Sequence, residues 1–482
     1  MTMNDFVVSL MLLGALSSQD GHTPFWATAG RFGVYPEGNG AVALFQASMP
    51  YKTGDLLQWH WGTSLGVGNG SIFLDETYGG LKWRNLRLDL GMKHSLQAFM
   101  ASSPELGSMS VTGGNFMMSG NARSMPGYTL ELEPLDIPFT GGHLQLSGRF
   151  GDYTTIDKRF VQGALVHNTA AFLHWHAGTG LTFTAGLDHY TMWGGTSPIY
   201  GVQKVSFGNY LRILTGSSGG QDASLGDQIN SLGDHRGREL LGMVYSGDVW
   251  SISYQYDKPY DDRSGMTLRN YPDGTRTLSF SFKDKSRWIS DIVYEFHTTM
   301  NQSGEYERRE ATDKEISSRD PQLYFDEASG KYFVIRGGAD NYCKNFEYRS
   351  GWTAFGRQIG NPLFFTRGGE ICSGTWNNLL QAHHLGLSGS LFHKLPYRLM
   401  LTASRNYGCW FTADYLYGQG TRFDNPYLLF SSGFTTQFPF LNGSLLLIPG
   451  VYYDRFGCKP WFSGSFAASL SLKYIINKPH KS

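Results

Sequence analysis

The sequence predicts an all-β fold, a transmembrane antiparallel β-barrel of about 18 strands with short turns at one end and long loops at the other. Three observations support this prediction. Many segments alternate apolar and polar residues, and short connections between them alternate with long ones. Beyond residue 17 no run of about 18 uncharged apolar residues occurs, which argues against a helical membrane protein. The 61 glycines and 15% aromatic residues fit a barrel, whose apolar residues are hidden by alternation.

The closing stretch, KPWFSGSFAASLSLKYIIN (459–477), shows the alternation most clearly. From Phe462 to Ile476 the even positions hold apolar residues or glycine, whereas the odd positions are mostly serine. A period of two gives a strand one apolar and one polar face. Strands of globular proteins run roughly 3–10 residues, whereas a tilted membrane strand needs about 9–11. This stretch is therefore predicted to be a membrane strand, and since lipid cannot satisfy an open sheet edge, it should pair with the first strand.

Alternation and turn residues predict strands over most of the chain. They are expected near 24–33, 41–50, 56–66, 71–81, 86–98, 127–136, 142–153, 168–176, 180–193, 238–246, 249–257, 277–284, 287–299, 382–393, 396–407, 426–438, 441–457 and 461–476. In a soluble sandwich the apolar faces would instead cover a second sheet.

The lengths of the connections favour the barrel over the sandwich. Every second connection is short, whereas the other set contains the long segments 99–126, 194–237 and 300–381. A sandwich has no reason to keep its long loops at one end, but outer-membrane barrels have short periplasmic turns and long extracellular loops. With an even number of strands, both termini are expected on the periplasmic side.

The N-terminus resembles an export signal. FVVSLMLLGALSSQD contains an apolar stretch from Phe6 to Leu16, followed by small residues and a plausible cleavage site after Ser17. The preceding MTMND has no Lys or Arg, which departs from a typical signal. We therefore expect a signal peptide at 1–17 and a barrel at 18–482. The alternative is a buried N-terminal helix.

Charge and cysteine content narrow the functional classes. Forty basic residues balance forty acidic ones, which gives no support for a nucleic-acid partner. All four cysteines, Cys343, Cys372, Cys409 and Cys458, are expected on the long-loop side, where disulfides and free thiols both remain open. Their spacing lacks the C-x-x-C pattern of a zinc site, and no cofactor or metal is expected.

No catalytic motif stands in a fitting context, so function is expected in the long loops. Segment 194–237 places aromatic residues beside carboxylate, amide and guanidinium groups. Aromatic faces stack on pyranose rings, amides and acids bind hydroxyl groups, and arginine binds carboxylates, so this composition suits a sugar polymer. The alternative is that these residues bind one another and hold the loop in place.

Nine residues are predicted to contact a glycan. They are Arg123, Trp193, Tyr210, Asp227, Asn230, His235, Arg236, Trp352 and Arg357. Another set, predicted to face the lumen, is expected to form polar contacts that stiffen the wall. It consists of Arg87, Asp89, His174, His176 and Asp188.

Six segments carry a family resemblance that runs along most of the chain. They are HTPFWATAGRFG (22–33), SGNARSMPG (119–127), GLDHYTMWGG (186–195), GDQINSLGDHRG (226–237), DKPYDDRSGM (257–266) and YRSGWTAFGRQIGNP (348–362). Together they resemble the Wzi-type capsule assembly proteins, particularly their relatives in Bacteroidetes. The resemblance implies an 18-stranded barrel whose outer loops bind capsular polysaccharide without catalysis. Enterobacterial members carry a periplasmic helical bundle, and because only a few residues separate the predicted cleavage site from HTPFW, the role of that bundle is not carried over to this chain. They also tend to have Pro where this chain has Ser124.

The sequence thus predicts a non-enzymatic, monomeric outer-membrane protein whose partners are surface polysaccharide and membrane lipid. A porin or oligosaccharide transporter is the first alternative, since an 18-stranded barrel is wide enough for a channel. A surface hydrolase using Asp234 and His235 is the second. Deleting 305–375 is expected to leave the barrel folded and to release polysaccharide into the medium.

Overall fold

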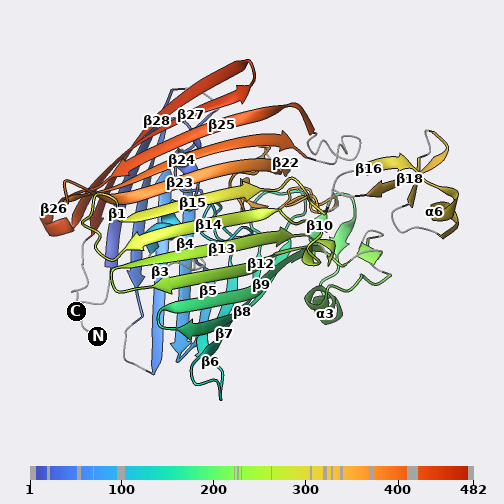
Figure 1. Ribbon diagram of the computed structural model, residues 1–482, viewed down its shortest axis with the longest axis horizontal. Helices are drawn as coiled ribbons and strands as arrows, with labels where there is room; N and C mark the ends of the chain where they lie inside the picture. Colours follow the sequence, from blue (N-terminus) through green and yellow to red (C-terminus); the bar gives the residue numbers. More distant parts are fainter. Residues whose placement is uncertain are drawn as a thin grey trace.

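The chain forms one closed barrel with long loops at one end (Figure 1). The computed structural model describes residues 7–18, 22–51, 56–68, 70–94, 104–221, 223–224, 227–228, 231–261, 263–303, 307–318, 323–326, 329–336, 340–367, 371, 374–409 and 422–475. Structural statements below concern these residues.

The barrel wall has eighteen antiparallel strands, each paired with its neighbours in sequence order, and pairing of the first strand with the last closes it. The wall strands are β1 (Val7–Ser17), β2 (Gly40–Met49), β3 (Leu57–Gly68), β4 (Ser71–Trp83), β5 (Leu86–Met92), β6 (Gly127–Asp136), β7 (Leu144–Thr154), β8 (Leu165–Gly178), β9 (Leu181–Trp193), β12 (Asp234–Ser246), β13 (Trp250–Tyr260), β14 (Gly274–Phe282), β15 (Asp291–Thr298), β23 (Leu379–Leu391), β24 (Leu395–Gly408), β25 (Arg422–Thr436), β27 (Leu445–Cys458) and β28 (Trp461–Ile475). The short β26 (Phe438–Phe440) extends the β25 side of β27.

The predicted alternation places apolar side chains outside and polar side chains inside. In β28, Phe466 and Leu470 are about half exposed, whereas Ser465 and Ser471 are buried on the lumen side. The outward residues thus form a surface suited to lipid. Among the described residues, no helix is long and apolar enough to cross a membrane. The predicted all-β barrel is confirmed.

The stretch predicted as a signal peptide lies in the wall. Residues 7–17 form β1, which pairs with β2 on one side and with β28 on the other. Leu12 and Leu16 point outward, whereas Leu13 is buried against Val34 of the loop inside the barrel. Because lipid covers one face and protein the other, β1 is apolar on both faces and resembles a signal sequence. Removing residues 1–17 would open the barrel, so the boundary placed after Ser17 conflicts with the fold.

The strand predicted at 24–33 is wrong. Residues Phe25–Thr28 form the short helix α1 inside the barrel, and turns follow it. Gly30 and Gly33 adopt φ angles of 66° and 65°, which a strand does not allow. The count of eighteen is right only because β1 replaces this segment.

The long connections leave the barrel at one end, as predicted. Residues 18–39, 93–126, 194–233 and 299–378 all connect strands there, whereas the connections at the opposite end are short. Ser9 pairs with Ile475, so both ends of the described chain lie at the short-turn end. In Figure 1 the strand β26 marks the short-turn end, and the long loops project from the other.

The loops contain the remaining elements. The helices are α1, α2 (Pro104–Met109), α3 (Phe207–Thr215), α5 (Arg263–Met266) and α6 (Asp313–Ser318), and a 3₁₀ turn occupies Leu441–Gly443 in a short connection. The loop strands are β10 (Gly195–Ser197), β11 (Gly201–Gln203), β16 (Glu307–Glu310), β17 (Leu323–Asp326), β18 (Lys331–Arg336), β19 (Thr353–Ala354), β20 (Arg357–Gln358), β21 (Phe365–Thr366) and β22 (Thr375–Asn377). Strands β16–β18 form a separate three-stranded sheet, which we call the outlying sheet (Figure 1).

Loops fill the lumen at the long-loop end. We call the segments 22–39, 104–126, 155–164 and 340–364 the plug. Its buried residues include Trp26, Phe116 and Trp352, and they form one hydrophobic cluster with inward residues of β8, β9, β23, β24, β27 and β28. Because these strands lie on opposite sides of the barrel, the cluster crosses the lumen.

Candidate functional site

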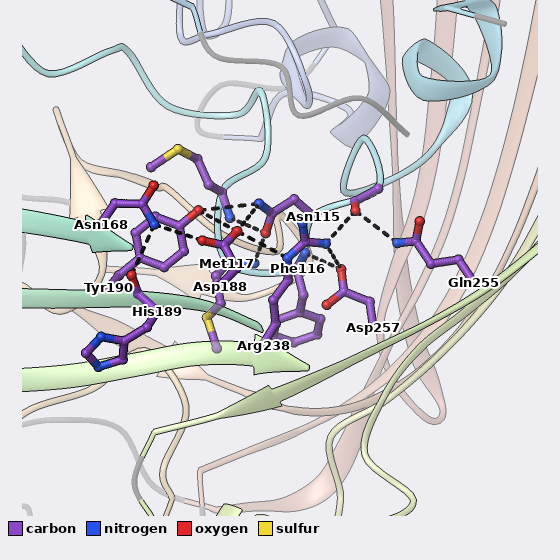
Figure 2. Close-up of polar contacts among 12 residues, drawn as sticks. Asn115, Phe116, Met117, Asn168, Asp188, His189, Tyr190, Arg238, Gln255 and Asp257 are labelled. Atoms are coloured by element: carbon purple, nitrogen blue, oxygen red, sulfur yellow. Dashed lines mark hydrogen bonds and ion pairs between the residues drawn. The ribbon is translucent and has the colours of Figure 1, made fainter. Parts of the chain in front are cut away.

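A buried ion-pair network holds the plug to one side of the wall (Figure 2). Arg238 of β12 lies 3.3 Å from Asp188 of β9 and 2.8 Å from Asp257 of β13. The same guanidinium group donates to the carbonyl oxygen of Gly114, and Asp257 accepts from the backbone N–H of Phe116. These residues are almost fully buried. The arginine therefore pairs with two wall carboxylates and also binds the plug.

A second anchor lies farther along the same part of the wall, where only β14 separates β15 from β13. Glu295 of β15 accepts hydrogen bonds from the Ser110 hydroxyl at 2.6 Å and from the backbone N–H of Val111 at 2.8 Å. His384 of β23 lies 2.6 Å from the Met109 carbonyl oxygen. The segment 109–116 thus bridges β15 and β23 to the strands around Arg238.

The largest loop packs on this bridge. The indole N–H of Trp352 donates to the Met117 carbonyl oxygen at 2.5 Å. The Ser119 hydroxyl donates to the Gly360 carbonyl oxygen at 2.6 Å. Both plug segments therefore form one folded unit.

Three predicted glycan residues are buried among packed loops, two of them at the plug and one against α3. Trp352 and Arg236 are fully buried, and the guanidinium group of Arg236 lies 5.1 Å from the Trp352 ring and pairs with Asp234. Trp193 is 4% exposed and packs against Ile213 of α3. These positions favour the structural alternative, in which the residues hold the loops together.

Two further predicted residues lie on the outer face of the barrel. The Tyr210 hydroxyl of α3 donates to Asp152 at 2.8 Å, and His235 lies 3.0 Å from His189. Since successive strand residues point to opposite faces, Asp234 points to the plug while His235 points outward. The Asp234–His235 pair on which the hydrolase alternative rested does not form.

The two predicted arginines of the plug lie near each other but contact different groups. Arg357 donates to Asn121, to the Thr28 carbonyl oxygen and to Glu37, so it ties three loop segments together. The guanidinium group of Arg123 lies over the rings of Phe73 and Phe355 at 4.4 and 4.8 Å. Burial lowers the pKa of Arg123, although Asp75 opposes this effect. The ninth predicted residue, Asn230, lies outside the described residues.

Asp227 is a buried carboxyl group in the loop 194–233. Burial raises its pKa to about 7, and the nearby negative charge of Glu347 adds to the effect, whereas a hydrogen bond from the Gly233 N–H opposes it. Burial also raises the pKa of Glu347, which accepts from the Ser224 hydroxyl at 2.9 Å. The contact between the loops 194–233 and 299–378 thus brings two carboxyl groups together.

We predict that this contact weakens as the pH rises from about 4 to about 7. A carboxyl group whose pKa is raised on folding binds its proton more tightly in the packed loop, so its stabilising contribution is complete below about pH 4 and is lost by about pH 7. Within this range each pH unit should lower hydrogen-exchange protection of the loop by up to about tenfold, and above it the effect should level off. Asp227→Asn should remove this dependence, whereas Asp284→Asn in a short turn should retain it. Equal pH dependence in wild type and Asp227→Asn would contradict the prediction.

The outlying sheet carries a surface that sequence reasoning missed. Phe325 of β17 and Tyr332 of β18 are opposite each other, with ring centroids 4.9 Å apart, and both are more than 40% exposed. Lys331 and Glu310 form an ion pair at 2.8 Å beside them. The alternation in KYFVIR signals a strand, but the sequence does not show that the rings of Phe325 and Tyr332 are exposed.

A cavity of about 380 Å³ lies between the plug and the inner face of β5, β6 and β7. Its charged lining consists of Arg87, Lys93, Arg123 and Arg149 with Asp89 and Glu131, and His94 also borders it. Of the nine residues predicted to bind glycan, only Arg123 lines this cavity.

The predicted wall contacts are present. Arg87 pairs with Asp89 and Glu131. Asp188 pairs with Arg238. His174 forms a hydrogen bond with the hydroxyl group of Thr184, and His176 forms one with that of Thr182. The described cysteines Cys343, Cys409 and Cys458 are free thiols, and Cys372 lies outside the described residues.

The chain is similar to known proteins in fold more than in sequence. No protein-family model matches the chain, and no curated protein does. Among solved structures, Wzi of Escherichia coli, an outer membrane protein involved in group 1 capsule assembly and a carbohydrate-binding β-barrel, is 12% identical, with a TM-score of 0.54 over 98% of this chain and 84% of its own. The chain has the fold of an outer-membrane β-barrel. OprD of Pseudomonas aeruginosa is 10% identical, with a TM-score of 0.46 over 99% of this chain and 95% of its own. The resemblance to the Wzi type is thus confirmed for the fold, while family membership stays a prediction.

Proposed function

We propose that the protein holds a surface polysaccharide at the long-loop end of a closed outer-membrane barrel, with that end outside the cell and without catalysis. The exposed pair Phe325–Tyr332 carries this proposal. Two aromatic rings on a projecting sheet offer a stacking surface for the apolar faces of pyranose rings, and neighbouring charged groups suit hydroxyl groups. The plug supports a binding role over the porin alternative, because packed protein occupies the lumen.

The plug also changes the deletion suggested by the sequence. Removing 305–375 would take out Trp352 and Gly360, which pack against the segment 109–119. Removing 307–336 takes out the outlying sheet and leaves the plug. The smaller deletion is therefore the better test of polysaccharide binding.

We predict that Phe325→Ser with Tyr332→Ser weakens polysaccharide binding at least about tenfold, because two stacking contacts are lost. Purified protein is titrated by biolayer interferometry against polysaccharide isolated from the strain that expresses it, and cell-bound and released polymer are measured in parallel. Phe139→Ser, which changes a fully exposed aromatic residue at the short-turn end, is the matched control. Unchanged binding and unchanged cell-bound polymer in the double variant would reject the proposal.

A further inference from the structure

The cavity beneath the plug has more positive than negative charge. Its charged lining has four cationic side chains and two carboxylates, so cations outnumber anions by two among the lining residues. Both carboxylates are engaged. Glu131 pairs with Arg87, and Asp89 pairs with Lys93 at 2.7 Å and with Arg87 at 3.1 Å. The two cations that remain are Arg123 and Arg149.

The strand register explains why Arg149 is left without a partner. Glu131 of β6 lies directly between Arg87 of β5 and Arg149 of β7. Its carboxylate reaches Arg87, and within the part of the chain that the structure describes Arg149 forms no ion pair. Two of the three guanidinium nitrogens of Arg149, Nε and Nη1, are shielded from solvent and have no hydrogen-bond partner among the described residues. Shielded N–H groups without an acceptor cost free energy, and a ligand that supplies acceptor oxygens would satisfy them.

Arg123 adds a second cation to the same cavity. Its guanidinium group rests on two aromatic rings, and its Nε is also shielded and without a partner among the described residues. The two arginines come from different elements, one from the wall and one from the plug. The cavity thus offers planar donor groups, which bind carboxylate or phosphate oxygens in pairs.

We propose that this cavity binds an oxyanion, a carboxylate or phosphate group carried by a sugar, with Arg149 as the main partner and Arg123 as the second cation. The choice of a sugar as carrier rests on the proposed function; the choice of an anion rests on the lining. The cavity extends from the plug segment 118–125 along β5 to Arg87, which lies near the short turn at 84–85. A charged sugar unit bound there would be held in the lumen, separate from the surface of the outlying sheet.

The test uses the full chain in detergent, with D-glucuronate, inorganic phosphate and D-glucose as probes at constant ionic strength. We expect glucuronate or phosphate to raise the unfolding temperature saturably, while neutral glucose does not. A response to glucuronate alone assigns the site to a sugar carboxylate, and a response to phosphate alone assigns it to a phosphate group. No saturable response to either anion would overturn the proposal.

Arg149→Gln is expected to weaken anion binding at least about tenfold, because a charge-assisted pair of hydrogen bonds is lost. Arg149→Lys retains the charge without the planar donors and should bind weakly. Arg276→Gln changes an arginine that stacks on Tyr256 outside the cavity and should bind anions like wild type. Full anion binding by Arg149→Gln would reject the assignment.

The two proposals fail in different ways. If the cavity binds no anion, the proposal that Phe325 and Tyr332 bind polysaccharide is unaffected and is tested separately by the titration with polysaccharide. If the aromatic variants retain polysaccharide while Arg149→Gln loses anion binding, the cavity remains an anion site in a protein of another function.

Discussion

Replacing Arg238 by alanine will release the plug and open the barrel. The change leaves Asp188 and Asp257 as unpaired buried carboxylates and removes a donor to the Gly114 carbonyl oxygen. Breaking a buried ion pair from one side costs about 3–5 kcal/mol of stability. We expect current steps in planar lipid bilayers for Arg238→Ala, where wild type stays closed, and a lower unfolding temperature.

The matched control is Arg276→Ala, which removes an arginine from the outer side of the neighbouring strand β14. It should leave both the closed state and the unfolding temperature nearly unchanged. Adding Asp257→Asn to Arg238→Ala should recover part of the stability, because one of the two unpaired charges is then removed. A closed barrel in Arg238→Ala would show that the plug is held mainly by its hydrophobic cluster.

Deleting residues 1–17 from the chain will prevent formation of a closed barrel. The deletion removes β1 and leaves β2 and β28 with unpaired backbone groups facing lipid, which the membrane interior does not tolerate. We expect loss of the gel mobility shift between heated and unheated protein and recovery of the chain in aggregates. Mass spectrometry of wild-type protein from membranes should find residues 7–17 retained.

Deletion of 307–336 is the control for removing a segment of the chain, since it removes the outlying sheet and no wall strand. That variant should keep the mobility shift. A folded protein isolated from membranes without residues 1–17 would support the signal peptide and contradict the wall position of β1.

Most of the wall could be predicted because its strands meet lipid on one face and polar groups on the other. In β28 this difference appears directly in the sequence as Phe466 and Leu470 against Ser465 and Ser471. In β1 the difference between the two faces disappears, because the plug covers the inner face and the inward Leu13 is as apolar as the outward Leu12. The alternation of apolar and polar residues reflects what covers each face of a strand. The sequence does not show that a loop distant from β1 folds into the barrel and covers its inner face.

The loops were harder to interpret for the same reason. Trp352 and Arg236 have the residue types of a sugar site, but these types also pack well in a protein interior. Burial decides between the two roles, and only the structure supplies it. Conversely, Phe325 and Tyr332 occupy an ordinary hairpin in the sequence, and their exposure marks them as candidate contacts. Arg149 was not singled out, since its lack of a partner depends on Glu131 bonding to the strand on its other side.

The pairing of β1 with β28 constrains the order in which the molecule is made. The strand β1 pairs with β2 soon after synthesis, but its other edge stays open until β28, the last strand, is made. The interior also brings together residues as far apart in the sequence as Trp26 and Trp352. Such distant pairings make folding slow and leave a long-lived, unfinished species. Chaperoned delivery of this chain must therefore protect its N-terminal strand for the whole time needed to complete the sheet.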